Sequence, residues 1–310
     1  MPGAEHIAPF HCYRCAYGHA GPESCGLACA KMVDYVLGRE GDVAAVIAEP
    51  MRAVPVVPPA GYWKAVQEAC HRNGALLIMD EIPTGLGKTG RMFAFEHDGI
   101  TPDIVTLGKA LGGGILPIAA VIAREDLNVA GDFAIGHYTH EKNPLTARAA
   151  LTTIEIIEEE GLVERAAVLG GWAMDQLREA LAGNDHVGDV RGRGLMFGVE
   201  MVKSRESRAP APELAERIYY AALAAGLSFK ISAGSVLTLS PPLTISRDDL
   251  GRALGIVVTA IARRRLFFTC GTATAILLNS NCVCPAMVSV KASGMPLNGT
   301  CTIWTLAWAL

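Results

Sequence analysis

Two ionisable residues, an aspartate and a lysine, each follow a short apolar run in the middle of the chain. Asp80 comes after ALLIM, and Lys109 comes after DIVTLG. Both runs are typical of buried strands, so both side chains would leave a sheet at a strand end. A desolvated lysine has a lowered pKa and condenses with aldehydes, and an aspartate beside it could keep a pyridine nitrogen protonated. The pair therefore suits pyridoxal-phosphate chemistry, and a structural salt bridge between the two residues is the alternative.

The segments that would position these residues alternate between helix and strand patterns. Residues 29–40 and 62–74 have the spacing of amphipathic helices. Residues 42–49 have the pattern of a strand that ends in Glu49. A strand, a helix and a strand of these lengths predict an α/β fold, with a parallel-rich sheet and flanking helices. Ligands gather at the carboxyl ends of such strands, where Glu49 and Asp80 both fall.

The pattern changes in the second half of the chain. Two long amphipathic helices lead to glycine-punctuated strands, a further helix, two strands and a last helix that begins at Ser246. We therefore expect residues 1–155 to form a partial large cofactor-binding domain and residues 156–265 to form a smaller α+β domain. Residues 266–310 contain one charged residue, Lys291, and no sustained period. We expect this tail to be an addition to the fold and to be disordered.

The composition excludes some classes of function. The net charge is −4, the pI is near 6.1, and no basic run is longer than residues 263–265, which disfavours nucleic-acid binding. No stretch of about 18 apolar residues is present, and the first residues lack a charged-then-apolar signal pattern. We therefore expect a cytoplasmic protein that does not bind membranes.

The nine cysteines are unevenly placed, and four of them lie in the pairs CYRC and CGLAC near the start of the chain. Paired cysteines are typical of zinc knuckles, but the second pair has three intervening residues and no histidine completes a known pattern. We expect reduced thiols packed in a loop, and no metal site.

The central stretch, residues 80–114, resembles the signature of the class III pyridoxal-phosphate-dependent aminotransferases. This fold-type-I family includes ornithine, acetylornithine and 4-aminobutyrate aminotransferases. The resemblance runs from about His11 to near Arg265 and includes four further motifs, AEP, HYTHEKNP, VRGRGLMFGVE and SPPLTI. The motifs are long and specific, so they predict membership of the family.

The resemblance implies a role for four residues. Lys109 would bind the cofactor aldehyde and later move a proton on the substrate carbon, and Asp80 would pair with the pyridine nitrogen. Thr139 matches the family pattern T-x-x-x-N-P and would donate to the cofactor phosphate of a neighbouring subunit, which implies a homodimer with shared active sites. Glu49 would lie on the substrate side of the cleft.

Other polar and small residues of these motifs have simpler interpretations. Gly112, Gly113 and Gly114 would allow close backbone approach near the lysine, although a flexible loop would have the same sequence. His137 and His140 are expected to be loop residues, because Lys109 already fills the acid/base role.

Two residues depart from the family pattern. Pro83 stands where most members have a glutamine that hydrogen-bonds the cofactor, and proline has no side-chain donor. Thr238 stands where many members have the arginine that clamps the substrate carboxylate. Residues 228–245 are closer to a branch that contains lyases acting on amino-phosphonates or phosphorylated amino-alcohols.

The family has a long segment before the part that matches residue 11, and that segment carries the phosphate-binding turn and an aromatic residue that stacks on the ring. This chain therefore resembles about the C-terminal two-thirds of such an enzyme. The expected function is transfer of an amino group from an amine to a keto acid or aldehyde, with the truncated chain inactive. An ammonia- or phospho-lyase and a catalytically silent fragment are the alternatives.

Overall fold

The computed structural model describes residues 3–129, 132, 139, 141, 143–262, 269–270 and 273–274. The chain divides into two compact units, Met1–Leu266 and Phe267–Leu310. Within the second unit the structure describes β9 (Thr269–Cys270) and β10 (Ala273–Thr274), which pair in antiparallel fashion. The other residues of the predicted tail lie outside the described part.

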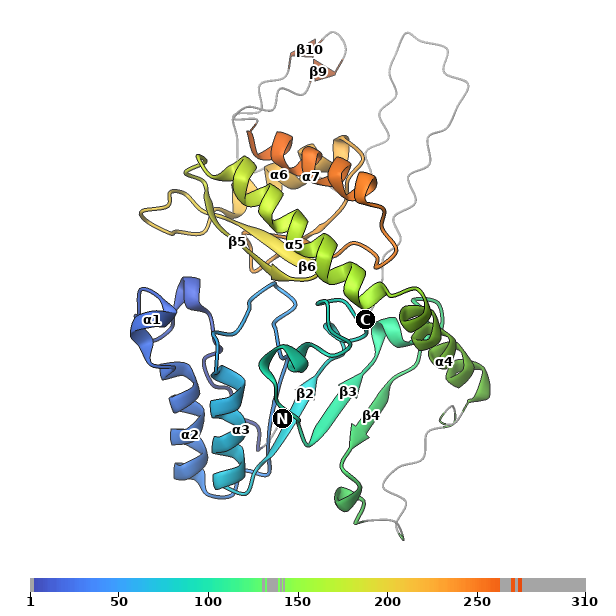
Figure 1. Cartoon of the computed structure of the whole chain (residues 1–310). Helices are drawn as coiled ribbons and strands as arrows, with labels where there is room; N and C mark the ends of the chain where they lie inside the picture. The colour runs from blue at the N-terminus through green and yellow to red at the C-terminus, as the bar shows by residue number, and fades with distance from the viewer. Residues whose placement is uncertain are drawn as a thin grey trace. The chain divides into compact units, whose positions relative to one another are not determined.

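Four short strands form the first sheet of the larger unit, in the order β1-β2-β3-β4 (Figure 1). They are β1 (Ala45–Ala48), β2 (Leu76–Asp80), β3 (Ile104–Leu107) and β4 (Ala120–Ala123). The strands β1, β2 and β3 run parallel, and β4 is antiparallel to β3. The buried β2 and β3 come from the two apolar runs that the sequence singled out, and the α/β class with a parallel-rich sheet is confirmed.

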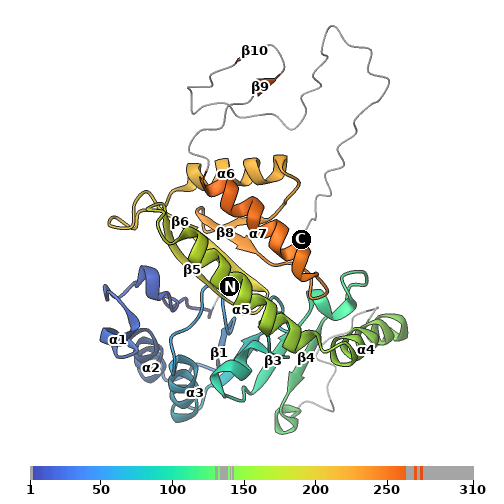
Figure 2. The same ribbon diagram turned by 45° about the horizontal axis from the view of Figure 1, so that its top comes forward.

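Two helices, α2 (Ala28–Glu40) and α3 (Tyr62–Arg72), lie side by side next to this sheet (Figures 1 and 2). They share an apolar core with β2 because their buried faces carry residues such as Val33 and Trp63, which meet Leu77. The indole Nε1 of Trp63 donates to the carbonyl of Pro50 at 2.7 Å. This bond satisfies a buried donor and fixes α3 to the chain that leaves β1.

The chain continues through short helical turns and two long helices. The turns are η1 (Cys12–Arg14), α1 (Pro22–Cys25), η2 (Ala94–Asp98), η3 (Lys109–Gly112) and η4 (Glu125–Leu127). The long helices are α4 (Pro144–Glu159) and α5 (Leu162–Leu181). The Asn143 side chain accepts from the backbone N–H of Leu145 at 3.0 Å, so the predicted start of α4, with asparagine as the cap and proline in the first turn, is confirmed.

A second sheet has the order β5-β6-β8-β7 and is antiparallel throughout. Its strands are β5 (Val187–Arg193), β6 (Met196–Met201), β7 (Lys230–Ser232) and β8 (Val236–Leu239). The helices α5, α6 (Pro212–Ala224) and α7 (Arg247–Ala262) share its apolar core. The backbone N–H of Asp249 donates to Ser246 Oγ at 3.0 Å, which caps α7 as the sequence predicted.

The helix α5 packs against the turn between β5 and β6 without room for a side chain. A Cβ atom added at Gly170 would lie 2.0 Å from the carbonyl oxygen of Gly194. Gly194 itself has a φ of +52° and lies close to the backbone of Lys88 and Thr89. Three distant segments therefore meet backbone to backbone at this point. None of the described helices is long and apolar enough to cross a membrane.

Candidate active site

The first sheet brings three of the predicted residues to one edge. Glu49 directly follows β1, Asp80 ends β2, and Lys109 follows β3 after a single residue, Gly108. Because these strands are parallel and adjacent, their carboxyl ends meet at the same edge of the sheet, with Asp80 on the middle strand. The sequence-based expectation for Glu49 and Asp80 is met, and the next strand brings Lys109 to the same edge.

The Asp80 carboxylate is half-buried, and the described hydrogen bonds to it all end on one of its two oxygens. Its Oδ1 accepts from the backbone N–H of Ile82 at 3.1 Å and from the Thr106 hydroxyl at 3.2 Å. Within the described part of the chain, no protein donor reaches Oδ2. Sequence reasoning missed Thr106, which lies beside Asp80 only through the register of β2 and β3.

Lys109 differs from the expectation of a desolvated amine, because its side chain is exposed. Its backbone has a φ of +44°, in the left-handed region that only a minority of side chains adopt. This conformation turns the chain sharply at the start of η3, and no described residue covers the amine. No ion pair within the described residues joins Lys109 to Asp80, so the structural salt bridge, which was the alternative, is absent there.

The glycines after Lys109 shape this turn. Gly113 and Gly114 have φ values of +68° and +77°, which glycine adopts without strain. A Cβ at Gly112 would lie 3.2 Å from a methyl group of Ile118, and one at Gly113 would lie 3.1 Å from Thr153 Oγ1 on α4. The expected close approach therefore occurs at Gly112 and Gly113, whereas the space around Gly114 is open.

The remaining predicted residues have different surroundings. Glu49 is half-buried, and its Oε2 accepts from the backbone N–H of Ala53 at 2.7 Å. Thr139 lies in a turn with its side chain exposed. No described contact joins Thr139 to the other candidate residues. The positions of His137 and His140 lie outside the described residues.

The desolvated lysine of this region is Lys88, which sequence reasoning did not single out. Burial lowers the pKa of Lys88 to about 8, and its Nζ donates to the carbonyl of Pro241 at 2.7 Å. The Lys88 carbonyl in turn accepts from the backbone N–H of Leu195 at 2.9 Å. Lys88 thus links the loop after β2 to the chain that follows β8.

The structure describes both residues that depart from the expected family pattern, Pro83 and Thr238. Pro83 lies in the turn directly after β2, half-buried, where it offers no side-chain donor. Thr238 is buried on β8, and its hydroxyl donates to the Ser232 hydroxyl at 2.9 Å. The side chain of Thr238 therefore carries no charge and is already paired within the second sheet.

The residues at the sheet edge fit the ring and the aldehyde of pyridoxal phosphate. Asp80 offers a carboxylate oxygen that has no protein partner in the described part of the chain, and its other oxygen is fixed by two donors. Lys109 offers an amine with no described partner on the neighbouring strand. A carboxylate and an amine so placed can hold a pyridine nitrogen and bind an aldehyde.

The chain as a whole is similar to proteins of one known family. The family description aminotransferase class III matches residues 8–261. An (R)-1-hydroxy-2-aminoethylphosphonate ammonia-lyase from Vibrio splendidus is 40% identical over 277 aligned residues, which cover 85% of this chain and 58% of that protein. A leucine/methionine racemase from Thermococcus litoralis is 42% identical over 267 residues, which cover 83% of this chain and 59% of that protein. The chain thus spans less than two thirds of the length of these relatives.

Solved structures agree with the sequence relatives. The omega transaminase from Pseudomonas jessenii in complex with PMP superposes with a TM-score of 0.79 and 31% sequence identity. The match covers 84% of this chain and 60% of that one. An aminotransferase from Bacillus anthracis gives a TM-score of 0.75 at 33% identity, over 83% of this chain and 61% of that one.

Proposed function

We infer, because this chain belongs to the class III aminotransferases, that it supplies the ring-binding and lysine part of a pyridoxal-phosphate site. Enzymes of this class depend on pyridoxal phosphate. The proposed reaction is transfer of an amino group from an amine to a keto acid or aldehyde. The observation that carries the proposal is the position of Asp80 and Lys109 at one edge of neighbouring parallel strands. The match covers 58% of the length of the Vibrio ammonia-lyase. The similarity alone therefore does not establish the activity, which we propose.

Each residue has a distinct task in this proposal. Bound pyridoxal phosphate supplies an electron sink for the charge that develops on the substrate carbon. Asp80 holds the proton on the ring nitrogen, and Thr106 and the backbone of Ile82 keep the carboxylate in place. Lys109 would bind the cofactor aldehyde through its amine and would move the proton at the substrate carbon. Glu49, which follows the strand next to that of Asp80, would lie on the substrate side.

Replacing the lysine tests this proposal directly. The purified chain with added pyridoxal phosphate should develop the visible absorbance of a lysine-bound cofactor, and Lys109→Ala should abolish it. Lys64→Ala is the matched control, since Lys64 is an exposed lysine on α3. Absence of the band in the unchanged chain at saturating cofactor would instead favour a catalytically silent chain.

One observation favours a second candidate, an ammonia- or phospho-lyase. Thr238 stands in place of a carboxylate-binding arginine, and its hydroxyl is paired with Ser232. An uncharged, satisfied side chain cannot hold a substrate α-carboxylate through two parallel hydrogen bonds as arginine does. A relative named as an ammonia-lyase on an aminoethylphosphonate is 40% identical to this chain.

The two reactions differ in what they release. A transaminase converts the bound cofactor to its amine form and needs a keto acid or aldehyde to turn over. A lyase releases ammonia or phosphate from a phosphonate or phosphate amine without any acceptor. Ammonia release in the absence of an acceptor would therefore replace the first proposal with the second.

We further propose that two copies of the chain form a homodimer with shared active sites. We also propose that the protein is cytoplasmic. The exposed side chain of Thr139 is available to a neighbouring subunit, where it would donate to the cofactor phosphate. Light scattering should give twice the chain mass. Thr139→Ala should weaken cofactor binding, and a monomer that binds cofactor equally well with and without Thr139 would contradict this assignment.

A further inference from the structure

The two cysteine pairs near the start of the chain come together around one small cavity. Cys12 opens η1, Cys15 follows it, Cys25 ends α1, and Cys29 lies in the first turn of α2. All four side chains line a cavity of about 20 Å³. A cavity of this size holds about one water molecule, and residues from three separate elements, η1, α1 and α2, line it.

These four cysteines are not arranged as a metal site. Within the described residues, no group of three or more histidine, cysteine, aspartate or glutamate side chains could hold a metal ion. All four are free thiols. Cys29 is buried, the other three are half-buried, and Cys25 donates weakly to the carbonyl of Pro22 at 3.4 Å. The chemistry open to such a group is therefore that of thiols.

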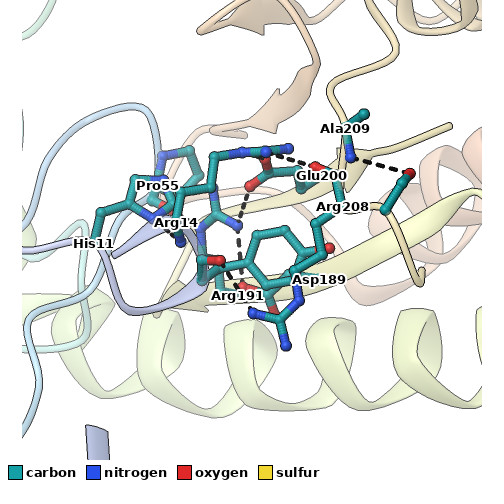
Figure 3. Close-up of polar contacts among 10 residues, drawn as sticks. His11, Arg14, Pro55, Asp189, Arg191, Glu200, Arg208 and Ala209 are labelled. Atoms are coloured by element: carbon teal, nitrogen blue, oxygen red, sulfur yellow. Dashed lines mark hydrogen bonds and ion pairs between the residues drawn. The ribbon is translucent and has the colours of Figure 1, made fainter. Parts of the chain in front are cut away.

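Arg14, the second of the two residues between Cys12 and Cys15, anchors this segment to the second sheet. Figure 3 shows the buried Glu200 carboxylate between the guanidinium groups of Arg14 and Arg191. Arg14 binds Glu200 through Nε and donates to the carbonyl of Arg208 at 2.6 Å through Nη1. A bond from Cys12 to another element would therefore add a second restraint to residues 11–15.

We propose that Cys12 and Cys29 form an oxidisable pair that a hydroperoxide converts to a disulfide, tying residues 11–15 to the start of α2. The two cysteines come from separate elements and line the same cavity, and Cys29 is the most buried of the four. Burial raises the pKa of the Cys12 thiol, and among its cysteine neighbours Cys29 raises this pKa most, which agrees with their proximity.

The reaction needs one hydroperoxide per disulfide. Burial raises the pKa of both thiols, so the reacting thiolate is a minor species and the oxidation should speed up as the pH rises. The sulfur of one thiolate attacks the peroxide oxygen, the O–O bond breaks, and an alcohol leaves, or water when the oxidant is hydrogen peroxide. The resulting sulfenic acid is attacked by the second thiolate, so that an S–S bond forms and water leaves. The two thiols lose two protons and two electrons, and the peroxide accepts both electrons.

Peptide mapping of the full chain tests the pairing. Trypsin cleaves after Arg14 and after Lys31, so Cys12 lies in peptide 1–14 and the other three cysteines lie in peptide 15–31. After treatment of the reduced chain with hydrogen peroxide and alkylation of the remaining thiols, we expect the two peptides to be linked. Fragmentation of the linked species should show Cys15 and Cys25 alkylated and Cys29 bound to Cys12.

Single substitutions separate this pairing from its alternatives. Cys12→Ser and Cys29→Ser should each abolish the link, whereas Cys15→Ser and Cys301→Ser, a control in the tail, should retain it. Before reduction, the oxidised chain should also be cut more slowly by trypsin after Arg14 under native conditions. A link that persists in Cys29→Ser, fragmentation that places the bond on Cys15 or Cys25, or oxidation of Cys12 without any link would overturn the proposal.

Discussion

The Thr106 hydroxyl donates a hydrogen bond to the Asp80 carboxylate across two parallel strands, with 3.2 Å between Oγ1 and Oδ1. The two residues are paired in the register of β2 and β3, so the bond follows directly from the strand alignment. It leaves the second carboxylate oxygen available at the sheet edge. The orientation of the proposed ring-binding group is thus set by the neighbouring strand.

Removal of this hydroxyl should loosen the carboxylate without changing the fold. Thr106→Val keeps the shape and the β-propensity of the side chain but loses the donor. A hydrogen bond to a charged group contributes about 1.5 kcal/mol, so we expect about tenfold weaker binding of pyridoxal phosphate. A cofactor titration followed by absorbance measures this. The control is Thr153→Val, which removes only the hydrogen bond from the Thr153 hydroxyl to the Ala149 carbonyl within α4. This variant should bind pyridoxal phosphate as tightly as the unchanged chain does.

Adjacent glycines of α5 should respond in opposite ways to alanine. At Gly170 a Cβ would overlap the Gly194 carbonyl, whereas at Gly171 no atom lies within 4 Å. We expect Gly170→Ala to lower the free energy of unfolding by about 3 kcal/mol, because backbone must move to admit the methyl group. Gly171→Ala should leave it unchanged or raise it by up to about 1 kcal/mol through helix propensity. Urea unfolding of both variants checks this, and equal effects would contradict the close packing.

The Glu200 carboxylate should be essential to the stability of the cluster in Figure 3. It is 2% exposed and binds both Arg14 and Arg191. Glu200→Gln keeps the volume but removes the counter-charge of Arg14 and leaves Arg191 paired with Asp189 alone, which should cost about 3 kcal/mol. The exposed Glu213→Gln on α6 is the control and should change the unfolding free energy by less than about 0.5 kcal/mol. A similar loss of unfolding free energy in both variants would show that the ion pairs of Glu200 do not stabilise the fold.

Lys88 should give the fold a distinct pH dependence. Its pKa in the folded chain is about 8, below the ordinary lysine value of 10.5. Between these values the unfolded chain binds more protons, so this residue makes the unfolding free energy rise with pH, by up to about 3 kcal/mol. Cys70, whose pKa burial raises to about 11, acts in the opposite direction above pH 9.

The contribution of Lys88 is therefore measured by comparing the unfolding free energy of the unchanged chain with that of a variant at this position. Lys88→Met has a similar volume and cannot titrate. The unfolding free energy of the unchanged chain minus that of the variant should increase from pH 8 to pH 10.5, since Cys70 contributes equally to both. A difference that stays constant over this range would show that Lys88 is solvated.

Local patterns were sufficient to predict the strands of the sheet edge and the residues that follow them. Glu49, Asp80 and Lys109 were found because each directly follows an apolar run, and strand ends can be identified from the sequence. Thr106 was missed because its bond depends on the register between two strands. Lys88 was missed because its hydrogen-bond partners, residues 195 and 241, are far away along the chain.

The exposure of Lys109 could not be predicted for a related reason. The apolar run before it indicates burial, but Lys109 has a left-handed backbone at the start of the turn η3, and its side chain is exposed. No propensity assigns that conformation to lysine. The convergence of four cysteines on one cavity was equally hidden, since the spacing within each pair says nothing about how η1, α1 and α2 fold onto one another.

The left-handed backbone of Lys109 also bears on laboratory evolution of this chain. A side chain with a Cβ costs on the order of 1 kcal/mol there, a cost that glycine does not have. A library sorted only for heat resistance should therefore enrich glycine at position 109 and discard the amine. Selection for a more durable chain has to be coupled to a screen for cofactor binding, or it will remove the residue on which the proposed chemistry depends.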